Sequence, residues 1–259
     1  MNEIGTEKPT KVFISHSSED SAFVKPLVEL FEHIGLNSEN MFCSSAPGYG
    51  VPLHGNIYNY LKKQFQNYDL RVIFVLSENY YKSVDSLNEM GAAWVLQHRY
   101  TSVLLPQFDF RDTKGVIKDM EISIKLDSEK FELRGRLNEL RNTLIEEFGL
   151  SNSLQSQTIW ERHRDEFIEK VNSIEIYWRQ LRQLRERNKP LEDWVLPLQK
   201  LIEVNPSSYD AMYMLGTIYA ETNDLENAIK YLTRTMNLSQ SSELKEKAGK
   251  QLEKLGYTI

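Results

Sequence analysis

The sequence predicts an α/β fold with a doubly wound, mostly parallel sheet, followed by a smaller all-α domain. Over residues 1–150, short apolar runs rich in β-forming residues alternate with segments of helical periodicity. The run 70–76 (LRVIFVL) is apolar almost throughout, which is typical of a strand buried on both faces of a parallel sheet. Beyond this region no strand pattern follows, and helical periodicity continues alone.

Each expected element follows from a local pattern. The run 11–15 (KVFIS) predicts a strand, followed by a helix that Asp20 or Ser21 would cap and Gly35 would end. The later elements are strands over 41–43, 70–76, 102–105 and 121–126, and helices over 57–65, 86–98 and 131–148. This strand–helix alternation predicts that a ligand would bind at the carboxyl ends of the strands.

A polar connector over 151–157 separates this domain from a helical domain over 158–259. Four residues of the helical domain have the spacing of a 34-residue helix-turn-helix repeat: Leu215, Gly216, Tyr219 and Ala228. The segment 209–242 therefore resembles a tetratricopeptide repeat, with a degenerate copy over 175–208 and a capping helix over 243–257. Because two copies are fewer than the three usually needed, we expect them to pack on helix 158–174 or on another chain.

The composition excludes several classes of function. The chain has 31 Lys and Arg residues against 37 Asp and Glu residues, a net charge of −6, so we expect no nucleic-acid partner. No apolar run approaches the roughly 20 residues of a membrane span, and the N-terminus lacks the apolar core of a secretion signal. Cys43 is the single cysteine, and the histidines lack metal-site spacing. We therefore expect a cytoplasmic protein without a metal.

Glu89 is the strongest candidate for a catalytic residue. It lies early in the helix after the most buried expected strand, at the edge of the sheet where a ligand would bind. Because its neighbours are apolar, its carboxylate would either lose its charge or pair with a cationic ligand. The alternative is a capping role in an S-x-x-E arrangement with Ser86, which the spacing alone favours.

The turn after the first strand is a second candidate. Ser15, His16 and Ser17 could offer hydrogen bonds to a diphosphate or to ribose hydroxyls near a helix N-terminus. The alternative is that the turn only caps the following helix through Ser18 and Asp20.

The loop 44–52 (SSAPGYGVP) is the third candidate. Its glycines would let the backbone approach a ligand closely, and its tyrosine could stack on a base. The candidate ligand-binding residues of this loop are Ser44, Ser45, Gly48, Tyr49 and Gly50. By pattern alone, ordinary turn formation explains the same residues.

Four segments in combination resemble the TIR domain of bacterial proteins, which has this flavodoxin-like wound fold. They are 12–20 (VFISHSSED), 41–56 (MFCSSAPGYGVPLHGN), 70–83 (LRVIFVLSENYYKS) and 87–94 (LNEMGAAW). The resemblance implies that loop 44–52 is the family's BB loop, which helps to form the active site and domain contacts. Many bacterial TIR domains are NAD glycohydrolases with an essential Glu, and the pattern S-x-x-x-L-N-E assigns that role to Glu89. The family often has Trp at the position of Asp85.

The resemblance also implies a substrate and partners. NAD would be the substrate, with no further cofactor, and the products would be nicotinamide and ADP-ribose or a cyclic ADP-ribose. TIR enzymes generally assemble so that a neighbour's BB loop completes the site, which implies a homo-oligomer formed by TIR–TIR contacts. Residues 158–259 would govern assembly or bind a protein partner, and such proteins resemble bacterial anti-phage defence components.

Two other functions are compatible with the residues. The first is a non-enzymatic adaptor that uses homotypic TIR contacts and the repeat to bind proteins. The second is a nucleoside deoxyribosyltransferase, which shares the wound α/β fold and an active-site Glu.

Overall fold

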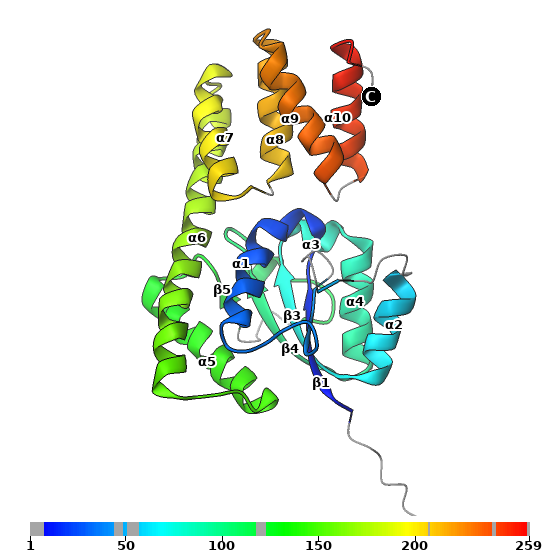
Figure 1. Cartoon of the computed structure of the whole chain (residues 1–259), viewed down its shortest axis with the longest axis vertical. Coiled ribbons are helices and arrows are strands. Elements are labelled where there is room, and N and C mark those ends of the chain that lie inside the picture. Colours follow the sequence, from blue (N-terminus) through cyan, green and yellow to red (C-terminus); the bar gives the residue numbers. More distant parts are fainter. Residues whose placement is uncertain are drawn as a thin grey trace, which may run out of the picture. The chain divides into compact units, whose positions relative to one another are not determined.

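The computed structural model describes residues 8–43, 49–50, 57–117, 123–206, 208–239 and 242–257. The chain forms two compact units, Met1–Ile168 and Glu169–Ile259. The first is an α/β unit and the second is helical, as the sequence predicts (Figure 1).

The sheet of the first unit has five parallel strands in the order β2-β1-β3-β4-β5. The strands are β1 (Thr10–Ser15), β2 (Met41–Phe42), β3 (Asp69–Leu76), β4 (Arg99–Leu104) and β5 (Ile124–Lys125). The run predicted as the central strand is β3, whose residues Leu70–Leu76 are all buried. The expected strand over 121–126 is shorter in the structure, where two of its described residues pair with β4.

Helices cover both faces of this sheet. They are α1 (Ser21–Glu32), α2 (Ile57–Asn67), α3 (Glu78–Lys82), α4 (Val84–Val95) and α5 (Lys130–Phe148), with short 3₁₀ turns η1 (Ser18–Asp20) and η2 (Phe110–Asp112). Figure 1 shows α1 and α5 on one side of the sheet and α2, α3 and α4 on the other. The chain passes from β1 to β2 in one direction and from β2 back past β1 to β3 in the other. With right-handed crossovers, this reversal opens a crevice at the carboxyl ends of β1 and β3.

Aromatic side chains fill the core between the sheet and α2. The rings of Phe13 and Phe42 stack with centroids 5.3 Å apart, and Phe65 of α2 meets Phe13 edge-on at 5.6 Å. On the same face, Tyr80 of α3 and Met90 of α4 are fully buried. This packing fixes α2 and α4 beside the crevice.

Two helix starts differ from the sequence prediction. Asp20 occupies the N-cap position of α1, but its carboxylate accepts hydrogen bonds from Ser77 Oγ and, at 2.8 Å, from Asn79 Nδ2 rather than capping the helix. The helix expected over 86–98 begins at Val84, where the Ser83 hydroxyl accepts from the Ser86 amide. The short helix α3 was not predicted, because five polar and aromatic residues are too few to show an apolar period.

The connector between the domains also differs from the prediction. Residues 151–157 do not form a separate linker, since helix α6 (Leu154–Glu186) already begins within them. The Ser153 hydroxyl accepts from the Ser156 amide 3.2 Å away, which starts the helix four residues early. The first half of α6 belongs to the α/β unit, where Trp160 Nε1 donates to Asn138 Oδ1 of α5 at 2.8 Å. The boundary between the two units therefore falls inside α6, after Ile168.

The helical unit continues with α7 (Glu192–Val204), α8 (Tyr209–Glu221), α9 (Leu225–Leu238) and α10 (Ser242–Lys254). The α8–α9 pair corresponds to the predicted repeat over 209–242. A Cβ atom at Gly216 would lie 2.8 Å from Leu232 Cγ and 3.2 Å from the Leu232 amide nitrogen, so only Gly permits this close approach. The rings of Tyr219 and Tyr231 stack across the same pair, 5.9 Å apart.

Neither unit offers a bilayer-spanning segment: in the described part of the chain, every helix is too short or too polar to cross one.

An ion-pair cluster joins α5 to the amino ends of the central strands. Glu147 of α5 accepts from Arg71 Nε at 2.9 Å and pairs with Arg99 Nη1 at 3.0 Å, and Arg99 also pairs with Asp69. The side chains of Arg71 and Glu147 are only 11% and 12% exposed. Removing one partner would therefore leave a charge in a poorly hydrated place.

We expect Glu147→Ala to lower the free energy of unfolding by about 3 to 5 kcal/mol, because Arg71 loses its buried partner. Glu146→Ala is the matched control, since Glu146 is exposed on the same helix and should change the value by less than about 0.5 kcal/mol. Urea unfolding of both variants measures the difference. Equal values for the two variants would show that the cluster does not stabilise the fold.

Gly216→Ala should destabilise the helical unit by about 1 to 3 kcal/mol, because its methyl group collides with Leu232. At Gly135 of α5 nothing lies within 4 Å of an added Cβ, so Gly135→Ala should instead stabilise its helix by about 0.5 to 1 kcal/mol. Thermal unfolding followed by circular dichroism measures both. Stabilisation by both substitutions would contradict the close α8–α9 contact.

Candidate active site

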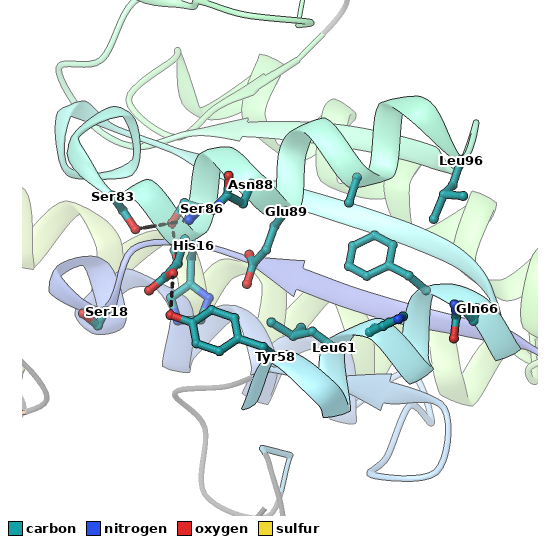
Figure 2. Close-up of a pocket in the computed structure, with 14 residues that line it drawn as sticks. His16, Ser18, Tyr58, Leu61, Gln66, Ser83, Ser86, Asn88, Glu89 and Leu96 are labelled. Carbon is teal, nitrogen blue, oxygen red and sulfur yellow. Dashed lines mark hydrogen bonds between the residues drawn. The ribbon is translucent and has the colours of Figure 1, made fainter. Parts of the chain in front are cut away.

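A cavity of about 490 Å³ lies at the crevice where the winding of the sheet reverses. Its lining comes from the turn after β1, from α2 and from the first three turns of α4 (Figure 2). Among the predicted residues, Glu89 and His16 line this cavity together. The structure thus joins two segments that are more than seventy positions apart in the sequence.

Glu89 lies in the second turn of α4, half-buried in the cavity wall. Its Oε2 accepts a hydrogen bond of 2.6 Å from the Oγ of Ser15, the last residue of β1. The pKa of Glu89 is raised to about 7, mainly by burial and to a smaller extent by the carboxylate of Asp85, while the hydrogen bond from Ser15 opposes both effects. Near neutral pH this carboxyl group therefore exists in both protonation states.

The capping role that spacing alone favours for Glu89 is wrong. The N-cap of α4 is Ser83, three residues before Ser86, so Glu89 is too far along the helix to reach the free amides of the first turn. Its carboxyl group instead bonds to Ser15 on a different element.

Tyr80 connects Glu89 to the interior of the domain. Its side chain is completely buried, and its Oη lies 3.0 Å from Ser15 Oγ and 2.9 Å from the carbonyl oxygen of Ser86, to which it donates. Burial raises the pKa of Tyr80, so the phenol stays neutral and keeps its proton.

Glu89, Ser15, Tyr80 and the Ser86 carbonyl form a hydrogen-bonded series, and the protons in it can be counted. When Glu89 is ionised, Ser15 donates to it and Tyr80 donates to the Ser86 carbonyl, so no proton lies between Ser15 Oγ and Tyr80 Oη. When Glu89 is protonated, each oxygen donates to the next, from Glu89 through Ser15 and Tyr80 to the carbonyl. In this count protonation of Glu89 adds one hydrogen bond, between Ser15 and Tyr80, and this works against the bond donated by Ser15, which lowers the pKa of Glu89.

His16 is held as a neutral ring. Its Nδ1 lies 3.1 Å from the carbonyl oxygen of Ile14, so this nitrogen carries the proton and donates. Burial lowers the pKa of His16 to about 4. The His16 carbonyl accepts from Ser86 Oγ at 3.2 Å, which ties the turn to α4. Next to it Ser17 is buried and does not line the cavity, whereas Ser18 does.

The structure describes two of the five candidate binding residues of loop 44–52. Ser44, Ser45 and Gly48 lie outside the described residues. Tyr49 and Gly50 are described, and neither lines the cavity.

Tyr49, the residue predicted to stack on a base, is bonded to α1 in the structure. Its hydroxyl donates to Glu32 Oε1 of α1 at 2.6 Å, and its carbonyl accepts from the Cys43 amide at 3.0 Å. Burial and the neighbouring Glu32 carboxylate raise the pKa of Tyr49 to about 12. These contacts direct the ring toward α1, on the other face of the sheet from α2 and α4 (Figure 1).

Helix α2 contributes a part of the cavity that was not predicted from the sequence. Tyr58 and Leu61 of α2 face α4 across the cavity in Figure 2, and Tyr58 Oη donates to Asp85 Oδ1 at 3.1 Å. This hydrogen bond joins the two helices at the rim. The helical period of α2 was visible in the sequence, but its face toward α4 could be identified only after the order of the strands was known.

The fold and the cavity define an α/β protein with a crevice at the reversal point of the sheet and a helical repeat unit. Residues 198–230 match the family model of the tetratricopeptide repeat. "Uncharacterized protein YddK" of Bacillus subtilis (strain 168) is a curated relative, 37% identical over 143 residues. The match covers 54% of this chain and 53% of the relative, so the chain spans about half the length of the curated relative it matches. No match to a TIR family model was found.

The proton count predicts the effect of Tyr80→Phe. Without the phenol, a protonated Glu89 could still donate to Ser15, but the Ser15 proton would have no acceptor, so the carboxylate becomes the favoured form. We expect the pKa of Glu89 to fall by about one unit, the value of one hydrogen bond. Carbon-13 NMR titration of the glutamate carboxyl groups, with Glu89→Gln to assign the signal, measures it.

Tyr81→Phe is the control, because Tyr81 donates to the Lys114 carbonyl at 3.2 Å and does not touch Glu89. An unchanged or raised pKa of Glu89 in Tyr80→Phe would show that the hydrogen bond between Ser15 and Tyr80 does not favour the neutral acid.

Proposed function

We propose that this protein is a TIR-type NAD glycohydrolase in which Glu89 is the catalytic carboxylate. One observation carries the proposal: an acid with a pKa near 7 is held by Ser15 inside the crevice of a wound α/β sheet. The TIR resemblance of the segments around Ser15 and Glu89 supports the same assignment. The products are nicotinamide and ADP-ribose or a cyclic ADP-ribose.

The chemistry requires a negative charge beside the ribose. When the bond between nicotinamide and C1′ breaks, positive charge develops on the sugar, and a carboxylate fixed in a poorly hydrated site stabilises that charge. Nicotinamide leaves as a neutral ring, so no general acid is needed. The ionised form of Glu89 is therefore the active one, while Ser15 orients it through the 2.6 Å hydrogen bond.

The turn after β1 supplies the polar groups for the rest of the nucleotide. Ser18 and the neutral ring of His16 line the cavity beside Glu89 and offer hydrogen bonds to ribose hydroxyls or to a diphosphate. We propose that Ser44, Ser45, Gly48, Tyr49 and Gly50 act from the BB-type loop in an assembled oligomer.

The helical unit is proposed to control assembly or to bind a protein partner. Its tetratricopeptide match supports protein binding, since such repeats present helical surfaces to peptides and other proteins. Homotypic contacts between the α/β domains would form the oligomer, and the biological setting would be anti-phage immunity.

A non-enzymatic adaptor is the second candidate. The observation that favours it is Asp85, which occupies the position where TIR enzymes often have Trp and which hydrogen-bonds to Tyr58 at the rim of the cavity. A scaffold that acts through its repeat would need no further contact with a substrate at this point.

Nicotinamide release from NAD tests the proposal. At high protein concentration the unaltered chain should release nicotinamide, and Glu89→Gln should reduce the rate by about 10² to 10³-fold, because the amide carries no charge. Glu78→Gln is the control, since the Glu78 side chain is 83% exposed on α3 and forms an ion pair with Lys82, away from the cavity. Chromatography of the second product separates ADP-ribose from a cyclic isomer.

Release should also increase as the pH rises through about 7, because the protonated form of Glu89 is inactive. Release that is the same in Glu89→Gln, or absent from the assembled protein, would favour the adaptor.

A further inference from the structure

Helix α4 has three faces, and two of them are accounted for by the fold and the cavity. One face packs into the aromatic core through Met90 and Ala93. A second face carries Asp85, Glu89 and Ala92 into the wall of the cavity. The third face belongs to neither, and yet it is apolar. We call it the outer stripe, and its residues are Val84, Leu87, Gly91, Trp94 and Val95.

The outer stripe leaves much of its apolar surface in contact with solvent. Val84 is 71% exposed, Leu87 40%, Trp94 58% and Val95 67%. From the usual areas of these residue types, the four residues together expose roughly 500 Å². A continuous apolar patch of this size is typical of an interaction surface.

The spacing of the outer stripe is that of a helix packed lengthwise against another helix. Its first four residues are separated by three, four and three positions, which is the a and d pattern of two heptads. Val95 follows directly after the last of them and widens the stripe. Since α4 already buries a different face against the sheet, this pattern indicates a second helix on its outer side.

Gly91 gives the middle of the outer stripe a bare backbone. Among the described residues, no heavy atom lies within 4 Å of a Cβ added there, so the packing inside the chain does not require a glycine. Gly135 of α5 is equally open, but its neighbours one turn away are the exposed acids Glu132 and Glu139. On α4 the surroundings of the glycine are apolar instead, which allows the backbone of another helix to approach closely.

A second copy of α4 has the shape that fits the outer stripe. Leu87 lies four residues before Gly91, and Val95 lies four residues after it. In an antiparallel pair with a two-fold axis at Gly91, Leu87 of each copy is therefore opposite Val95 of the other. The two glycines meet at the crossing point, where the missing Cβ atoms let the backbones come together.

Charge and area are also compatible with this pair. The outer stripe contains no charged residue, so two copies meet without like-charge repulsion. Antiparallel helices place the positive end of one dipole beside the negative end of the other. The four large residues of both copies would bury about 1,000 Å², which reaches the size of a specific interface before any flanking residue is counted.

We infer that α4 pairs with α4 of a second copy of this chain through the outer stripe, around a two-fold axis at Gly91. This inference goes beyond the proposed function, because neither NAD nor loop 44–52 takes part in the pairing. The cavity of each copy stays outside the contact, since no residue of the outer stripe lines it.

Val95→Glu tests the pairing, because it places a charge without a partner in the apolar contact. Sedimentation velocity of the full-length chain should show a dimer at about 100 μM, where even a micromolar Kd gives mostly dimer. Val95→Glu should raise the Kd at least tenfold. Phe131→Glu is the matched control, since Phe131 is also an exposed apolar residue but lies on α5, on the other side of the sheet (Figure 1).

Gly91→Cys tests the position of the two-fold axis. A disulfide needs Cα atoms within about 7 Å, so mild oxidation with diamide should cross-link two chains through this residue. Gly135→Cys should give no cross-linked dimer, and the natural Cys43 is buried in both variants.

The outcomes are decided without NAD, so they stand whether or not the chain is a glycohydrolase. A monomer at about 100 μM overturns the pairing and leaves the outer stripe to a different protein or to another part of the chain. A dimer that Val95→Glu leaves intact, or that Gly91→Cys does not cross-link, places the contact between copies elsewhere and also overturns it. A dimer that Val95→Glu dissociates and Gly91→Cys traps supports the inference.

Discussion

The hydrogen bond between Ser15 and Glu89 is the contact on which the geometry of the cavity depends. It joins the carboxyl end of β1 to the second turn of α4, so it fixes the distance between the strand and a helix on one face of the sheet. The reversal of winding between β1 and β3 makes room for this contact, because no helix covers the sheet at that point. Burial of Tyr80 beneath it excludes water from one side of Glu89.

The sequence predicted the elements that have a strong period. The strand β3 and the helices α2 and α5 were predicted because apolar runs and amphipathic faces extend over several turns or pleats. The boundary near α6 was not predicted, because polar residues with good helix propensity do not distinguish a linker from an exposed helical turn. Asp20 or Ser21 was expected to cap α1, and only the tertiary structure shows that Asp20 bonds to Ser77 and Asn79 instead.

The same limit applies to the candidate site. Glu89 could be selected from the sequence, because it is an acid among apolar residues on the helix after the most buried strand. Its partner Ser15 could not be assigned to it, nor could Tyr80 be assigned to Ser15, because contacts over 74 and 65 positions of sequence depend on strand order and helix tilt. The contribution of α2 depends on the same information, because a helical period identifies a buried face but not the element it packs against.

A substrate that carries a positive ring would change the protonation of its own catalyst. In the free protein burial raises the pKa of Glu89 to about 7, so much of the acid is neutral. A pyridinium placed within about 4 to 6 Å of Glu89 would favour the carboxylate and lower its pKa by about 1 to 3 units. The proton would leave on binding, so the catalytic charge forms only when the cation that it stabilises is present. In such a site the pH dependence of kcat/KM reports the pKa of Glu89 in the empty cavity. The pH dependence of kcat reports the lower pKa of Glu89 in the complex with the substrate.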